Sequence, residues 1–139
     1  MGVLKQLEID YDIDIVDDFL THFEIMTTSL EPLIISLSRP EIFASNVDEI
    51  FRVFHNIKSA SGFLHIETLL NFTKLCENVL ENVRLLQKEG DTASDELIDW
   101  LILASDELEK YRIDIENDAN YLHIFNPDLI HIPKVLFKN

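Results

Sequence analysis

The sequence predicts an all-α protein: an antiparallel up-down four-helix bundle with an extended N-terminal lead-in and a C-terminal arm or short fifth helix. Two observations lead to this prediction. Apolar residues recur every three or four positions along four long stretches of the chain. Glycine and proline, with 3 and 4 copies in 139 residues, are too scarce for the many turns of a sheet-rich protein. An irregular helical fold and a dimer that completes the bundle in trans are the alternatives.

The first helix follows an N-terminal segment of a different character. Residues 3–15 alternate apolar and acidic side chains, a strand-like period, but a single strand has nothing to pair with. We therefore expect an extended lead-in or a frayed first turn. The apolar stripe of the first helix consists of Val16, Phe19, Leu20, Phe23, Met26, Leu30, Leu33, Ile34 and Leu37. Pro32 lies inside this stripe and should kink the helix or split off its last turn.

The second and third helices should form a hairpin. Asn46 and Glu49 have the spacing of a capping box, so the second helix is predicted to begin near Asn46. Its apolar stripe consists of Val47, Ile50, Phe54, Ile57 and Leu64. The third helix should span about residues 67–88, and its inward positions are Leu69, Phe72, Cys76, Val79, Leu80 and Val83.

A polar loop around Gly90 should lead into the fourth helix, with Ser94 as its N-cap. The inward positions of this helix are Leu97, Leu101, Ala104, Leu108, Tyr111 and Ile115. The tail from Asn120 contains two prolines and many large apolar residues. It is interpreted as a short helix, an arm lying on the bundle, or a connection to something further along the chain.

Charge and composition limit the classes of partner. The net charge is −15, from 26 acidic against 11 basic residues, so the surface repels nucleic acid and anionic membranes. Cys76 is the single cysteine, and the sequence contains neither a membrane-length apolar stretch nor a signal-peptide layout. We therefore expect one cytoplasmic, monomeric domain over residues 1–139, with its bundle at about 14–118 and a tail at 119–139.

His55 is the candidate reactive residue. At 100° per residue it lies about 130° from the centre of the apolar stripe, so its ring should face solvent. The small residues Ser59 and Gly62 leave space above the ring, and Lys58 lies on the flank nearer the core. Residues 50–66 contain no carboxylate, so an anion would be tolerated here and almost nowhere else. We expect a large partner to dock on the face formed by Arg52, Ser59, Gly62 and Lys74.

Glu77 is the candidate partner of His55. Each lies 11 residues from position 66, in the tight turn of the hairpin, or roughly 16 Å along its own helix. The two side chains should therefore face each other. A carboxylate that accepts the proton of one ring nitrogen leaves the other nitrogen free as a nucleophile. Alternatively, His55 is an ordinary solvated side chain, and Glu77 pairs with Lys74 or Arg84 on its own helix.

The stretches "HNIKSASGFL" and "LCENVLENVR" together resemble the histidine phosphotransfer (HPt) domain. The similarity is closest to the N-terminal phosphotransfer domain of chemotaxis histidine kinases of the CheA type, and it covers roughly residues 12–115. The pattern of the family is a phosphorylated histidine, a lysine three residues later, small residues, and a carboxylate on the next helix. Here these are His55, Lys58, residues 59–62 and Glu77.

The resemblance implies a phosphocarrier that is not an enzyme in its own right. His55 would accept a phosphoryl group from a histidine kinase catalytic domain or a phosphorylated receiver, and pass it to an aspartate of a response-regulator receiver domain. Glu77 would orient His55, and Lys58 would stabilise the charge of the phosphoryl group. The partner would supply Mg²⁺, so the chain would need no cofactor or metal of its own. The start at Met1 and the unusual tail favour a free-standing carrier over a fragment of a larger kinase.

Three positions depart from the pattern of the family. Ser59 stands where glycine is common, and Lys74 stands where chemotaxis kinases often carry a second histidine. Lys74 could pair with Glu77 or add positive charge for the phosphoryl group. His65 stands at the helix exit, where glycine or asparagine tolerates a left-handed backbone, so His65 is interpreted as a helix-end residue.

The other candidates point to no second site. His65 and Glu67 lie near the turn, far along the helices from His55, so no metal-ligand set is predicted. No partners at useful spacing are found for His22, His123 and His131. Cys76 is interpreted as a core side chain and Trp100 as packing at an edge of the bundle. The alternative function is a binding-only bundle, a degenerate HPt relative that docks a kinase or receiver without carrying phosphate.

Overall fold

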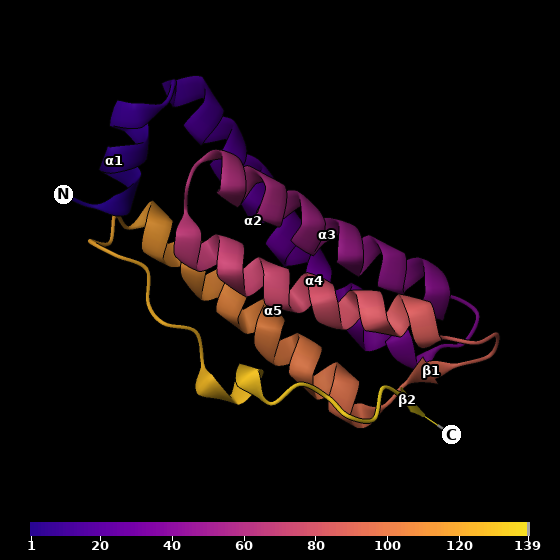
Figure 1. Cartoon of the computed structure of the whole chain (residues 1–139). Coiled ribbons are helices and arrows are strands. Elements are labelled where there is room, and N and C mark those ends of the chain that lie inside the picture. Colours follow the sequence, from indigo (N-terminus) through magenta and orange to yellow (C-terminus); the bar gives the residue numbers. More distant parts are fainter. Residues whose placement is uncertain (139) are drawn as a thin grey trace.

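The structure is a computed structural model that describes residues 1–138, and it is an all-α helical bundle (Figure 1). Its helices are α1 (Val3–Asp10), α2 (Ile13–Ile35), α3 (Phe43–Phe63), α4 (Glu67–Leu86) and α5 (Asp95–Glu116). The 3-10 turns η1 (Ser36–Ser38) and η2 (Pro127–Ile130) and the short strands β1 (Thr92–Ala93) and β2 (Phe137–Lys138) complete the described chain. None of the helices within residues 1–138 is both long and apolar enough to cross a bilayer.

The four long helices, α2 to α5, bury the apolar stripes that the sequence predicts. Every inward position predicted for α3, α4 and α5 is at most 3% exposed. Leu20, Met26 and Leu33 of α2 are only partly buried, while the rest of its stripe is buried. Burial also raises the pKa of the Cys76 thiol well above its usual value, because the thiolate would lose its hydration. Cys76 is therefore a core side chain, as predicted.

The expectation of an extended lead-in is wrong, because residues 3–10 form α1. A helix satisfies its own backbone groups, whereas a lone strand would leave them unpaired. The orphan donors of its first turn also find partners: Val3 N donates to Ala119 O at 2.7 Å, and Lys5 N to Asp118 Oδ1 at 3.1 Å. A Cβ on Gly2 would lie 2.0 Å from Asp118 Oδ1, so this close approach requires glycine.

The predicted capping box of the second helix is also wrong. The helix α3 begins at Phe43, and Asn46 lies inside its first turn, where its backbone N donates to Ile42 O. The Asn46 amide side chain instead donates to Leu33 O of α2 at 3.3 Å. Phe43 is 2% exposed, and its burial accounts for the earlier start.

The ends of α2 and α3 bear on the predictions made for Pro32 and His65. The helix α2 continues through Pro32 to Ile35, and the last turn tightens into η1 rather than breaking off at the proline. At the end of α3, His65 has φ 56°, and the N–H groups of His65 and Ile66 donate to Gly62 O and Ser61 O. This is a Schellman motif, and it confirms that His65 is a helix-end residue.

The tail is an arm that returns along α5 (Figure 1). Trp100 Nε1 donates to Leu129 O at 3.2 Å, and Leu129 is fully buried. Further along, Ser94 caps α5 by accepting from Leu97 N, as predicted, and its hydroxyl also donates to Val135 O. The strand β2 then pairs antiparallel with β1.

His123 in this arm has partners that the sequence analysis missed. Its Nδ1 lies 2.5 Å from Asp114 Oδ2, its Nε2 lies 2.5 Å from Glu107 Oε1, and its ring stacks on Tyr111. The ring of His123 is thereby held between two acidic side chains of α5. The neighbouring acids and burial raise the pKa of the Tyr111 hydroxyl, with burial contributing most.

Candidate functional site

The candidate site lies on the α3–α4 hairpin, and His55 presents its ring there. Because α3 and α4 are joined by the short turn after Phe63, residues at equal distance from the turn come level with one another. Phe54 and Ile57 of α3 are fully buried, which turns the intervening His55 outward. The His55 side chain is 50% exposed, so an incoming group can reach the ring.

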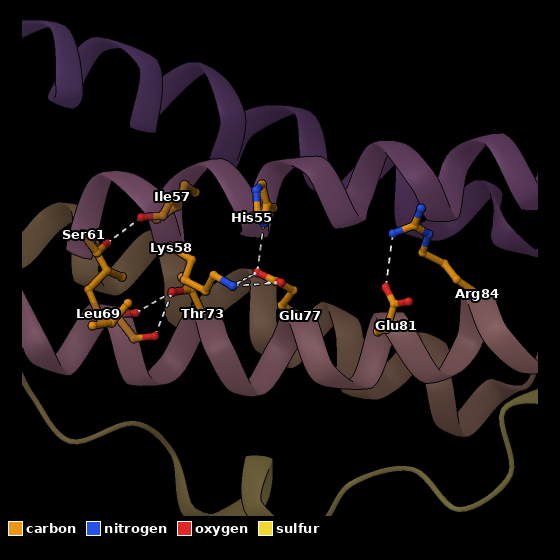
Figure 2. A network of polar contacts seen from close by, with 10 residues as sticks. His55, Ile57, Lys58, Ser61, Leu69, Thr73, Glu77, Glu81 and Arg84 are labelled. Carbon is orange, nitrogen blue, oxygen red and sulfur yellow. Dashed lines mark hydrogen bonds and ion pairs between the residues drawn. The ribbon is translucent and has the colours of Figure 1, made fainter. Parts of the chain in front are cut away.

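Glu77 reaches from α4 toward two residues of α3, as Figure 2 shows. Its Oε2 lies 3.3 Å from His55 Nδ1, and Lys58 Nζ lies 2.8 Å from its carboxylate oxygens. The Glu77 side chain is 16% exposed, compared with 27% for Lys58. The proximity predicted from the symmetry of the hairpin is therefore present, and the carboxylate is shared between an imidazole and an ammonium group.

This contact favours one tautomer of the His55 ring. An ionised Glu77 can only accept, so Nδ1 carries the proton and donates it toward the carboxylate. Nε2 then keeps its lone pair, and it has no hydrogen-bond partner among residues 1–138. The arrangement leaves one accessible nucleophilic nitrogen on a ring whose positive form the carboxylate would stabilise.

The predicted docking residues differ in their exposure and in their pairing. Arg52 is 66% exposed and pairs with Glu49 at 2.7 Å, so its charge is already partly neutralised. Ser59 is exposed and Gly62 is half-buried, and a Cβ at Gly62 would meet only Leu70 at 3.8 Å. The exposed Lys74 forms no ion pair or hydrogen bond within the described chain, so it does not pair with Glu77. The competing partner Arg84 pairs instead with Asp48 and Glu81.

Two features beside His55 were missed in the sequence analysis. A shallow groove of about 300 Å³ runs between α2 and α3 and is lined by Phe19, His22, Met26, Asn56 and Ala60. Phe51, one turn before His55, stacks on its ring. The i, i+4 spacing of Phe51 and His55 is a sequence signal that could have revealed the stack. The groove depends on how two helices pack, and no local pattern predicts it.

Metal-ligating side chains do not cluster at the site in the part of the chain that the structure describes. Within residues 1–138, no group of three or more histidine, cysteine or acidic side chains is arranged to hold a metal ion. His65 and Glu67 lie at the turn, where they line a pocket with α1, and they do not join His55.

Comparison with known proteins gives one partial similarity. The chain is 27% identical over 93 residues to the chemotaxis protein CheA of Treponema pallidum (strain Nichols). The match covers 67% of this chain but only 11% of the length of that protein, so it concerns one segment of a much longer relative. No protein-family profile and no solved structure matches the chain.

Proposed function

We propose that this chain is a histidine phosphotransfer module, which accepts a phosphoryl group on His55 and passes it to an aspartate of a response-regulator receiver domain. The observation that carries the proposal is the half-exposed imidazole whose Nδ1 faces Glu77 while Nε2 is left without a partner in the described chain. The partial similarity to a chemotaxis protein supports the same assignment.

The chemistry is a reversible displacement at phosphorus. The Nε2 lone pair attacks the phosphorus of the donor, an N–P bond forms, and the P–O or P–N bond to the leaving group breaks with its electron pair. The ring becomes cationic and keeps its proton on Nδ1, directed at Glu77. In the outward step an aspartate oxygen attacks the same phosphorus, and the electron pair of the N–P bond returns to Nε2.

Lys58 would supply positive charge to this reaction. In the free protein its ammonium group is bound to Glu77 at 2.8 Å. An incoming phosphoryl group offers a more highly charged set of oxygens, so Lys58 can bind the phosphate without a new cation being recruited. The Mg²⁺ and the acceptor aspartate would come from the receiver, and the donor would be a histidine kinase catalytic domain or a phosphorylated receiver.

A transfer assay tests this function. The purified chain is incubated with radiolabelled kinases and phosphorylated receivers from the same organism, and the label is followed onto the chain and then onto unlabelled receivers. We expect label that is labile in acid and more stable in alkali, as for phosphohistidine, and that moves on to a receiver. A partner that binds the chain but never labels it would contradict phosphotransfer and favour the binding-only alternative.

Removal of the Glu77 carboxylate should slow the phosphorylation of His55. We expect Glu77→Ala to lower the rate on the order of 10²-fold, because the ring loses both its orienting acceptor and the charge that stabilises its cationic form. Thermal unfolding should change little, since the partners of Glu77, His55 and Lys58, are 50% and 27% exposed and can be solvated once the carboxylate is removed. An unchanged rate in a single-turnover assay would mean that the 3.3 Å contact does not serve the reaction.

A further inference from the structure

We propose that Phe51 is a positioning residue for His55, held in place by Arg84, and this inference rests on the proposed function of His55. Phe51 and His55 lie one turn apart on α3. Their ring centroids are 5.9 Å apart and their planes differ by 10°, so the rings are stacked. The ring plane of His55 is thereby set by a neighbour that forms no hydrogen bond with it.

Glu77 alone leaves the orientation of His55 weakly defined. Its contact with Nδ1 is 3.3 Å long, slightly beyond the usual range for an N–H···O hydrogen bond, and the imidazole is half-exposed. The torsion that rotates an imidazole about its Cβ–Cγ bond also has a broad energy profile. A second contact on the face of the ring limits this rotation, so Glu77 selects the edge of the ring and Phe51 sets its plane.

Phe51 is itself held by a residue of the neighbouring helix. The guanidinium carbon of Arg84 lies 4.2 Å from the centroid of the Phe51 ring, a cation–π contact. Arg84 is fixed in turn by Asp48 at 3.1 Å and by Glu81 at 3.2 Å. Figure 2 shows the Arg84–Glu81 pair on α4, farther along the helix from Glu77. The α4 helix therefore constrains His55 twice, directly through Glu77 and indirectly through Arg84 and Phe51.

The test compares Phe51→Leu with the conservative variant Phe51→Tyr. Leucine keeps apolar volume but removes the flat ring, whereas tyrosine keeps it. The matched control is Phe63→Leu, which removes an aromatic ring from the same helix. Phe63 is 61% exposed and contacts Tyr11 rather than His55. Two readouts are followed: the ¹⁵N signals of the His55 ring in the unphosphorylated protein, and the phosphorylation rate with phosphoramidate and with a kinase.

We expect Phe51→Leu to lower the fraction of the Nδ1–H tautomer and to slow phosphorylation roughly 2- to 10-fold, the range that an aromatic pair can contribute. Phe51→Tyr should restore both, and Phe63→Leu should change neither. His55 ring signals in Phe51→Leu that match the unmodified chain would overturn the positioning role. An unmodified chain that takes up no phosphoryl group would instead overturn the proposed function, while the ring signals would still report on the stack.

Discussion

Replacement of His55 by glutamine should reduce phosphohistidine labelling of the chain to background. Glutamine keeps a side chain of similar length, and its amide nitrogen can still donate to Glu77, but it has no nucleophilic ring nitrogen. The His55 side chain is half-exposed and contributes no core packing, so the free energy of unfolding should change by no more than about 0.5 kcal/mol. Labelling from the cognate donor checks the loss of phosphohistidine. Urea unfolding of the same preparations checks the free energy of unfolding.

His22→Gln and His65→Gln are the matched controls for this experiment. Both histidines are exposed. His65 lies at the α3–α4 turn, and His22 lines the groove between α2 and α3. Both variants should be labelled as well as the unmodified chain. Persistent labelling of His55→Gln, or loss of labelling in one of the control variants instead, would place the phosphoryl group elsewhere and sink the assignment of His55.

Removal of the His123 ring should destabilise the whole protein rather than the tail alone. Glu107 is only 2% exposed, and its one hydrogen-bond partner within the described chain is His123. His123→Ala leaves this carboxylate buried without a partner, and the free energy of unfolding should fall by about 3 kcal/mol. This is the lower end of the range for breaking a buried ion pair, because the imidazole itself is 33% exposed. Urea unfolding followed by circular dichroism measures this loss.

His131→Ala is the control, since His131 lies in the same arm but is exposed, and its effect should stay within about 0.5 kcal/mol. The double variant Glu107→Leu with His123→Phe should recover most of the stability, because apolar residues of similar volume replace the buried ionic contact. A His123→Ala protein as stable as the His131→Ala control would show that the contact with Glu107 contributes nothing to the fold.

The sequence was sufficient to predict the four long helices and the contact at the candidate site. The helical period identified the inward positions because each helix buries one continuous stripe, from Val47 on α3 to Ile115 on α5. The proximity of His55 and Glu77 followed from the symmetry of an antiparallel hairpin with a short turn. The Ser94 cap and the left-handed His65 were also predictable, because both depend on local backbone chemistry.

The features that were not predicted depend on contacts between distant segments. The alternating apolar and acidic residues at positions 3–15 gave no helical signal for α1. This short helix is held by contacts with Asp118 and Ala119, near the other end of the chain. The partners of His123 lie 9 and 16 positions earlier, and the chain between them is partly irregular, so no helical or strand period relates them. The helix α3 begins earlier than predicted because Phe43 is buried in the core. This burial contributes more free energy than the local capping preference of Asn46.

The attachment of α1 also determines when it can fold. With 8 residues it is shorter than the roughly 12–15 that an isolated helix needs in water. Its backbone contact with Asp118 spans 113 positions of sequence, so the contact can form only once the end of α5 is in place. We therefore expect the N-terminal helix to form late in folding, and to open from the bundle while the α3–α4 hairpin stays folded.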